Sequence, residues 1–279
     1  MTLRNRAAAL ALVCIFAFVS LSAAQKPIVF ALAPDGLSAE ERMPLQNYLT
    51  KHMGREVKLV IPNNYNEDIT GMRDGTIDFA LLGAVNYVRA HYKVGAVPLL
   101  HRTSDMNTHA VFVTGANSSI KSLKDLKGKE MAFTDKYSTS GHVIPALEMK
   151  KFGVLETEVK PHFTGAHPNV AKLVESGVVD AGSLDENIYK SMIDQGKLDR
   201  SKIRVFYTTK PFVDWVFAAR KEVPEAERTK FIKALESLTP GRDDQVLRIL
   251  RATGFVSAND NEYAAIRQIA RELDILDSN

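Results

Sequence analysis

The sequence predicts an α/β protein made of two similar lobes. Short apolar runs of strand length alternate with helix-length stretches through most of the 279 residues, a pattern typical of parallel βαβ units with helices on both sheet faces. A helix–Gly–strand signature occurs twice, in residues 69–80 and 170–181, and each copy has an Asp three residues after the Gly. Open α/β sheets bind ligands at the carboxyl ends of their strands, so we expect a ligand in a cleft between the lobes.

The first 24 residues have the pattern of a secretory signal peptide. Arg4 and Arg6 precede an apolar run over residues 7–19, and Ser22–Ala24 offers small residues for cleavage. The run is too short to predict a membrane span. Cys14 lies inside the run rather than at its end, so we expect a periplasmic protein without a lipid anchor. Since Cys14 is the sole cysteine, removal of the signal would leave no disulfide or thiol nucleophile.

Composition limits the partners that the mature chain would have. Without the signal, 34 basic residues face 33 acidic ones, so net charge gives no argument for binding nucleic acid or a membrane surface. About 255 residues bury enough apolar surface to fold without disulfides. We therefore expect a monomer with no nucleic-acid partner.

The strands and helices of the first half follow from hydrophobic patterning. Buried strands are short and continuously apolar, which predicts strands at residues 27–32, 57–61, 77–82, 94–100 and 110–113. Ser38 and Glu41 form a capping-box pattern. Helices are expected at residues 38–52, 67–73 and from 83 onward.

The second half repeats this alternation and ends in helices. Strands are expected at residues 129–133, 159–163, 178–181, 203–207 and 215–219. Helices are expected between them, at residues 143–152, 169–175 and 187–193, and at the end of the chain, at residues 225–237, 243–252 and 261–273.

Three consecutive hydroxyl residues, Ser138, Thr139 and Ser140, lie where an expected strand ends and an expected helix begins, and Gly141 follows them. The first turn of a helix has unpaired backbone N–H groups and partial positive charge, which together favour an oxyanion. The alternative is helix capping, because Ser and Thr are favoured there in any case. One capping hydroxyl would suffice, so three in a row exceed what capping requires, and the residues alone leave both an anion site and a helix cap open.

Four segments of the sequence carry a resemblance to a known family. They are residues 65–78, 82–87 and 138–141, and Gly165–Ala166–His167 with the run that follows it. Together they resemble the periplasmic solute-binding proteins for phosphonate and phosphite, the PhnD type. The resemblance implies a two-lobed type II periplasmic binding protein fold with the ligand in the inter-lobe cleft. Lobe 1 would comprise residues 25–112 with 215–279, and lobe 2 residues 113–214.

The resemblance also implies a set of ligand-binding residues. Five fall on positions that contact the phosphonate oxygens in the family, namely Tyr65, Ser138, Thr139, Ser140 and His167. Two acids, Glu186 and Asp214, resemble positions that meet the amino end of an aminoalkyl ligand. The chain has Thr108 near a position where the family often has Tyr, which puts the side group of the ligand in doubt.

Each of these residues also has a structural interpretation. His167 would be a polar loop residue, Tyr65 an aromatic packed on its lobe, and the two acids surface residues. His142 is as readily a solvent-facing or cleft-lining residue as a ligand contact. Core positions are favoured for Tyr87 and Trp215.

The function that we expect is that of the periplasmic solute-binding component of an ABC importer, which closes on a small phosphorus oxyanion and presents it to a membrane permease. An alternative with the same fold is the ligand-sensing partner of a membrane kinase or chemoreceptor. A secreted hydrolase is a weaker alternative, because Ser140 lacks the Gly-x-Ser-x-Gly context. His162 and His167 are five residues apart and no His-Glu-x-x-His occurs. We thus expect no catalytic residues, metal or cofactor.

Overall fold

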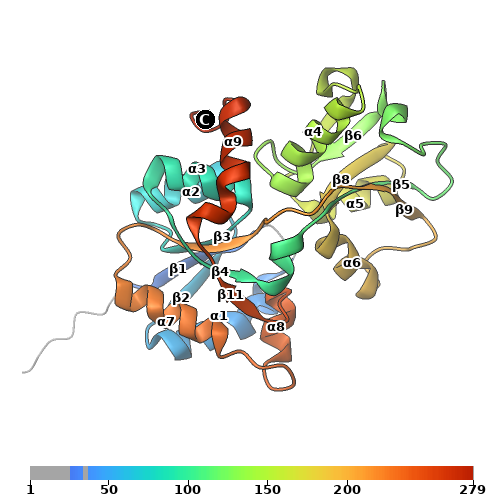
Figure 1. Cartoon of the computed structure of the whole chain (residues 1–279). Helices are drawn as coiled ribbons and strands as arrows, with labels where there is room; N and C mark the ends of the chain where they lie inside the picture. Colours follow the sequence, from blue (N-terminus) through green and yellow to red (C-terminus); the bar gives the residue numbers. More distant parts are fainter. Residues whose placement is uncertain (1–25, 34–36, 279) are drawn as a thin grey trace, which may run out of the picture.

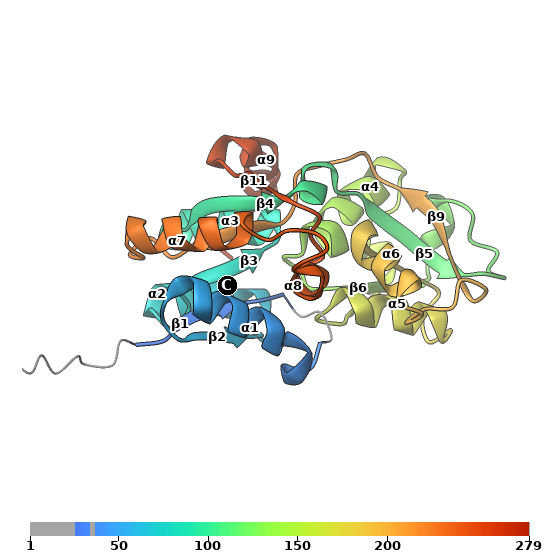
Figure 2. The same ribbon diagram turned by 90° about the horizontal axis from the view of Figure 1, so that it is seen from below.

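A computed structural model describes residues 26–33 and 37–278. Its strands form two β-sheets, one of six strands and one of five. We call the part built on the six-stranded sheet lobe 1 and the part built on the five-stranded sheet lobe 2; they lie side by side (Figures 1 and 2). This confirms the expected α/β class and its two lobes. The expected signal segment, residues 1–24, lies outside the described residues.

Lobe 1 has the strand order β11-β4-β10-β3-β1-β2. Its strands are β1 (Ile28–Ala31), β2 (Val57–Val60), β3 (Phe79–Leu82), β4 (Val97–Arg102), β10 (Val216–Ala219) and β11 (Phe255–Ser257). Its helices are α1 (Ala39–Met53), α2 (Tyr65–Asp74), α3 (Ala84–Val94), α7 (Glu225–Glu236), α8 (Asp244–Leu250) and α9 (Ala264–Glu272). Helix α1 begins at the expected capping box, in which Ser38 and Glu41 each accept the other's backbone N–H.

Lobe 2 has the strand order β7-β6-β8-β5-β9. Its strands are β5 (Ala110–Gly115), β6 (Glu130–Phe133), β7 (Lys160–Phe163), β8 (Ala181–Asp185) and β9 (Ile203–Thr208). Its helices are α4 (Ile144–Lys151), α5 (His167–Glu175) and α6 (Glu186–Asp194). Short 3₁₀ segments lie at Thr103–Asn107, Leu123–Leu126, Glu156–Glu158 and Asp260–Tyr263, and a π-helical turn, Thr139–Val143, precedes α4.

The expectation of parallel sheets is correct only for part of each lobe. Strands β1, β2 and β3 are parallel, as are β6, β7 and β8. In lobe 1, however, β10 runs antiparallel to β3 and β4, and in lobe 2 β5 runs antiparallel to β8 and β9. Both strands enter directly from the other lobe without a crossover helix, so they run opposite to their neighbours.

The repeated signature has the same structural role in both lobes. Gly75 and Gly177 adopt left-handed backbone angles, φ 69° and 73°, at the end of a helix. The Asp three residues later then joins the sheet: Val29 N–H donates to the Asp78 carboxylate and Glu130 N–H to the Asp180 carboxylate, both at 2.9 Å. The lobes are therefore similar down to individual hydrogen bonds.

Three strands differ most from the sequence-based prediction. The strand expected at residues 94–100 begins only at Val97, because α3 continues through Val94 and ends at Gly95. The strand expected at residues 178–181 begins only at Ala181, because the three residues before it form the turn that brings Asp180 to Glu130. Strand β11 was not predicted, since three residues are too few to show a pattern; it pairs antiparallel with β4.

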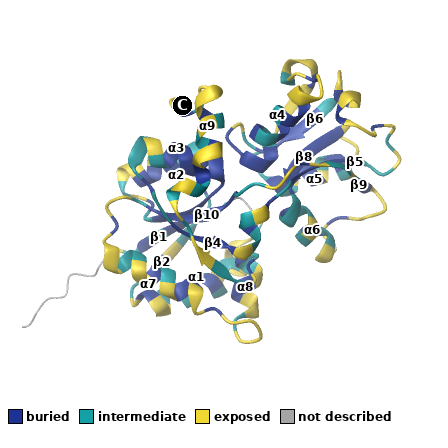
Figure 3. Ribbon diagram, viewed as in Figure 1, coloured by how far each residue is buried: buried dark blue, intermediate teal, exposed yellow. Residues whose placement is uncertain are grey.

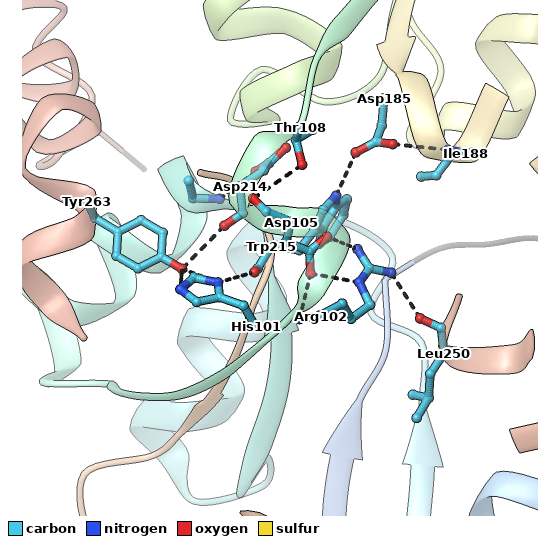
Figure 4. Close-up of polar contacts among 11 residues, drawn as sticks. His101, Arg102, Asp105, Thr108, Asp185, Ile188, Asp214, Trp215, Leu250 and Tyr263 are labelled. Atoms are coloured by element: carbon cyan, nitrogen blue, oxygen red, sulfur yellow. Dashed lines mark hydrogen bonds and ion pairs between the residues drawn. The ribbon is translucent and has the colours of Figure 1, made fainter. Parts of the chain in front are cut away.

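Two extended segments connect the lobes, and they pair with each other at the crossing. Thr108 and Phe212 exchange backbone hydrogen bonds of 3.0 and 2.9 Å. Next to this bridge, Arg102 forms a buried two-pronged ion pair with Asp105, and Arg102 also donates to the Leu250 carbonyl (Figure 4). Thr108 is fully buried in this connection and belongs to the hinge through its bridge to Phe212.

The core lies on both faces of each sheet and under the covering helices (Figure 3). In lobe 1 the Phe79 and Phe231 rings stack at 4.2 Å between centroids. Tyr87 is fully buried and packs 4.5 Å from the Tyr263 ring, which confirms its expected core position. Over the described ranges, no helix is both long and apolar enough to cross a membrane.

Candidate functional site

The three hydroxyls of lobe 2 have three different roles in the turn that follows β6. Ser138 is the expected cap, since its Oγ accepts the Gly141 N–H at 3.1 Å. Thr139 instead reaches lobe 1, where its Oγ1 accepts the Val85 N–H at 2.9 Å. Ser140 Oγ is buried and makes no well-formed hydrogen bond to a described residue, although its hydroxyl lies close enough to Asp214 to lower the pKa of that carboxyl. Helix capping therefore accounts for Ser138 but not for Thr139 or Ser140.

Gly141 lets this turn pack closely on the strand before it. A Cβ at this position would lie 2.0 Å from Thr134 Oγ1 and 2.8 Å from Ser138 Oγ. The Gly141 carbonyl accepts the Ser183 hydroxyl of β8 at 3.0 Å. The turn is thus fixed on the end of the lobe 2 sheet, where a side chain at Gly141 would displace it.

Lobe 1 contributes the N-terminus of α3 to the same place. The Ala84 N–H donates to Asp214 Oδ1 at 2.9 Å, and the next amide, Val85, donates to Thr139. A Cβ on Gly83 would lie 3.4 Å from Thr139 Oγ1, 3.5 Å from Asp214 Oδ1 and 3.9 Å from the Tyr65 ring. Tyr65, Thr139 and Asp214, three of the residues expected from the sequence, therefore meet around this helix start.

Tyr65 is the first residue of α2 and is almost fully buried. Burial raises the pKa of its hydroxyl, while a hydrogen bond with the Ser138 side chain from lobe 2 opposes that shift. Its carbonyl accepts the Asn86 amide at 3.0 Å. A pocket of about 10 Å³ lies beside Tyr65, Gly83 and Trp215. Tyr65 therefore faces the other lobe rather than packing only on its own.

Asp214 is a fully buried carboxyl in the segment that re-enters lobe 1. Burial raises its pKa to about 7, with a further contribution from Asp185, whereas the Ala84 amide and the Ser140 and Thr139 hydroxyls lower it. Asp214 Oδ2 has no hydrogen-bond partner among the described residues. Near neutral pH this carboxyl is poised between its charged and protonated forms.

His167 begins α5 in lobe 2 and is 2% exposed. Its Nδ1 accepts the Asp185 N–H at 3.1 Å, which places the proton of the neutral ring on Nε2. Burial lowers the pKa of the ring to about 4, although Asp185 works in the opposite direction. Nε2 is buried without a partner in the described part of the chain. His167 is thus a neutral, unused N–H donor at physiological pH.

Two adjacent acids, Asp185 and Glu186, lie at the start of α6. The buried one is Asp185, which was not among the expected site residues. Glu186 lies in the first turn of α6 and forms an ion pair with Lys190 at 2.8 Å; in the described part of the chain its side chain makes no hydrogen bond to the other expected residues. Asp185 is buried instead: it caps α6 through the Ile188 N–H and accepts the Trp215 indole N–H, both at 3.0 Å (Figure 4). Asp at an N-cap was a signal that the sequence analysis missed.

His142 and Trp215 both lie in packed surroundings. The His142 ring packs against Phe133 and Phe163 and pairs with Glu156 at 3.0 Å, so it points away from the other candidates. Trp215 is a buried core residue whose ring also borders the pocket beside Tyr65. In the described ranges, no group of three metal-ligating side chains comes together.

A two-lobed α/β fold with two crossing connections and converging polar groups between the lobes is that of a two-lobed solute-binding protein. Residues 30–263 match the family model for ABC transporter, phosphonate, periplasmic substrate-binding protein. The chain belongs to this family of periplasmic substrate-binding proteins of ABC transporters.

Individual relatives agree with this membership. A probable ABC transporter phosphite-binding protein, PhnD1 of Prochlorococcus marinus, is 28% identical over 81% of this chain and 82% of its own length. The phosphate-import protein PhnD of Mycolicibacterium smegmatis is 28% identical over 81% and 78%. The solved structure of PhnD1 in complex with methylphosphonate superposes with a TM-score of 0.82 at 25% identity and covers 90% of this chain and 99% of that one.

Proposed function

We propose that the mature protein binds a small phosphorus oxyanion between its lobes and presents it to the membrane permease of an ABC importer. The proposed contacts are Tyr65, Ser138, Thr139, Ser140, His167 and Asp214. We propose further that a cleaved segment, residues 1–24, directs the chain to the periplasm and that it works as a monomer. Asp185 positions His167 and Trp215 in this account, and Glu186 is left out.

The observation that carries the proposal is a pair of buried donors in lobe 2, Ser140 Oγ and His167 Nε2. Both are shielded from water. His167 Nε2 has no partner among the described residues, and Ser140 Oγ makes no well-formed hydrogen bond there beyond its contact with the Asp214 carboxyl. A buried donor without an acceptor is costly, so these two groups favour an oxygen-rich ligand that accepts from both. Hydroxyls and a neutral imidazole suit an oxyanion whose charge is not balanced by a guanidinium.

The buried Asp214 carboxyl limits which protonation states of the ligand can bind. A fully ionised phosphonate beside an ionised carboxylate would be repelled. A phosphonate or phosphite that keeps one P–OH group would donate that proton to Asp214 Oδ2, which has no described partner. We therefore propose that the bound complex holds one proton between the ligand and Asp214.

The side group of the ligand is small in this proposal. Of the two buried acids near the ligand, Asp185 is engaged by the α6 cap and the Trp215 indole. Asp68, which borders the pocket beside Tyr65, accepts from the Asn86 amide at 3.1 Å. Asp214 would then remain for an ammonium group, and it has the proton-accepting role described above. Phosphite and methylphosphonate therefore suit the site better than aminoethylphosphonate.

Calorimetric titration of the purified protein with phosphite, methylphosphonate, aminoethylphosphonate, phosphate and sulfate tests the proposal. We expect phosphite or methylphosphonate to bind most tightly, and sulfate, which has no proton to donate at neutral pH, to bind weakly. Failure of every phosphorus oxyanion to bind below millimolar concentration would refute the assignment.

A further inference from the structure

A cation–π contact joins the two lobes outside the proposed ligand contacts. The Arg89 guanidinium of α3, in lobe 1, lies 3.3 Å from the ring centroid of Tyr137, in lobe 2. Arg89 is fully buried and Tyr137 is 2% exposed. Such contacts are strongest when the cation is shielded from water. Separation of the lobes would remove this contact and expose both groups.

Arg89 is held in place from the lobe 1 side. Its Nη2 donates to the Asn66 side chain and to the Ser278 carbonyl, both at 2.8 Å, and its Nε donates to the Ile275 carbonyl at 3.0 Å. These hydrogen bonds orient the planar guanidinium, and its face is left for the Tyr137 ring. The charge is thus preorganised for a partner from lobe 2.

The segment Ile275–Ser278 bonds to both members of the pair. The Tyr137 hydroxyl donates to Ser278 Oγ at 3.1 Å, and Lys93 Nζ donates to the Ser278 carbonyl at 2.8 Å. Figure 1 shows this end of the chain beside α3 and α9. Arg89, Tyr137 and Ser278 therefore form one connected unit, which we call the clamp.

In each lobe the clamp adjoins a proposed ligand contact in the sequence. Tyr137 directly precedes Ser138, and Asn66 directly follows Tyr65. Tyr137 and Val143, which flank the hydroxyl turn, pack into a hydrophobic cluster built mainly of lobe 1 residues. The position of the hydroxyl turn relative to Tyr65 thus depends on where the clamp holds Tyr137.

We propose that the clamp of Arg89, Tyr137 and Ser278 holds the closed lobes together, positions the hydroxyl turn, and so sets how slowly ligand leaves. The identity of the ligand rests on the proposed function, whereas the contact between the lobes does not. The ligand must leave through lobe opening, and opening must break the clamp. Removal of the clamp then raises the dissociation rate more than it lowers the association rate.

The first test measures methylphosphonate and phosphite binding to Tyr137→Leu, with Tyr92→Leu as the matched control. Tyr92 is an exposed tyrosine on α3. We expect Tyr137→Leu to weaken binding at least tenfold through faster dissociation, with the melting temperature of the ligand-free protein nearly unchanged, and Tyr92→Leu to bind as the parent does. Tyr137→Phe keeps the ring, so most of the affinity should remain.

A double-mutant cycle separates the clamp from a general loss of structure. If Arg89 and Tyr137 act on each other, Arg89→Met with Tyr137→Leu weakens binding little more than the larger single change. Additive losses, or unchanged dissociation in Tyr137→Leu, would overturn the proposal.

A second measurement keeps this inference distinct from the proposed function. Spin labels at Met43→Cys in lobe 1 and Val178→Cys in lobe 2, both exposed positions, report the distance between lobes by double electron–electron resonance. Where residues 1–24 are retained, Cys14→Ser removes the other cysteine of the sequence. If none of the ions binds the parent protein, the proposed function fails. A closed population in the ligand-free protein that Tyr137→Leu abolishes would still support the clamp. A distance distribution that Tyr137→Leu leaves unchanged would overturn it.

Discussion

The two walls that meet between the lobes differ in how far their hydrogen-bonding groups are satisfied. In lobe 1 the first amides of α3 already donate to Asp214 and Thr139, and on that wall Asp214 Oδ2 alone lacks a partner among the described residues. In lobe 2 Ser140 Oγ and His167 Nε2 are buried; His167 Nε2 has no partner among the described residues, and Ser140 Oγ makes no well-formed hydrogen bond there beyond its contact with Asp214. The satisfied wall explains how the closed lobes fit together, and the unsatisfied wall indicates where a ligand gains its affinity. Changes to the two walls should therefore separate stability from binding.

The largest effect should come from His167→Ala. A hydrogen bond to a charged group contributes about 1.5–3 kcal/mol, so the loss of the Nε2 donor should weaken methylphosphonate binding roughly 10- to 150-fold. Titration calorimetry measures this, with His142→Ala as the control because His142 pairs with Glu156 away from the other candidates. Equal losses in both variants would refute a specific role for His167.

A smaller effect separates two neighbouring serines of the same turn. Ser140→Ala removes a buried donor, so we expect binding to weaken about tenfold while the ligand-free melting temperature stays nearly constant. Ser138→Ala removes the cap on the Gly141 amide, so we expect it to lower the free energy of unfolding by about 1 kcal/mol. Calorimetry and thermal denaturation of both variants test this. A reversed pattern would mean that Ser140 is structural and Ser138 only binds ligand.

A third effect, on stability rather than on ligand binding, concerns Asp214 and its dependence on pH. Its pKa is raised to about 7 in the folded protein and is about 3.9 when unfolded. The folded state therefore holds an extra proton between these values, and its stability is complete below pH 4 and declines as pH rises through 7. Asp214→Asn cannot ionise, so we expect it to exceed the parent in free energy of unfolding by more than about 1 kcal/mol at pH 8.

Urea denaturation of the ligand-free protein at pH 4.5 and pH 8 measures that difference. The advantage of Asp214→Asn should shrink at the lower pH. His167 works in the opposite direction, because its pKa is lowered to about 4, so His167 costs stability in both proteins as pH falls from 6.5 toward 4. An advantage that does not change with pH would show that Asp214 ionises normally.

Much of the fold followed from local patterning. Gly75 and Gly177 end helices as expected, because a left-handed residue is needed there and Gly adopts it without strain. The direction of β5 and β10 could not be predicted, since it depends on which lobe the chain arrives from. Strand order is a tertiary property, and an apolar run of four to six residues is compatible with either direction.

The structure brings several of the predicted site residues together, but their separate roles could not be predicted from the sequence. The sequence pointed to the turn at Ser138–Ser140, yet it could not assign separate roles to the hydroxyls, because these depend on contacts with lobe 1. The choice between Asp185 and Glu186 was also out of reach. Adjacent residues at a helix start point in different directions, and the residue at which α6 begins decides which carboxylate is buried.

The most direct test of the account is a crystal structure of the protein with methylphosphonate. The account predicts the phosphonate between the lobes, with its oxygens within hydrogen-bond distance of His167 Nε2 and Ser140 Oγ and one of them next to Asp214. A phosphonate bound elsewhere, or bound there with His167 Nε2 still unpaired, would contradict it.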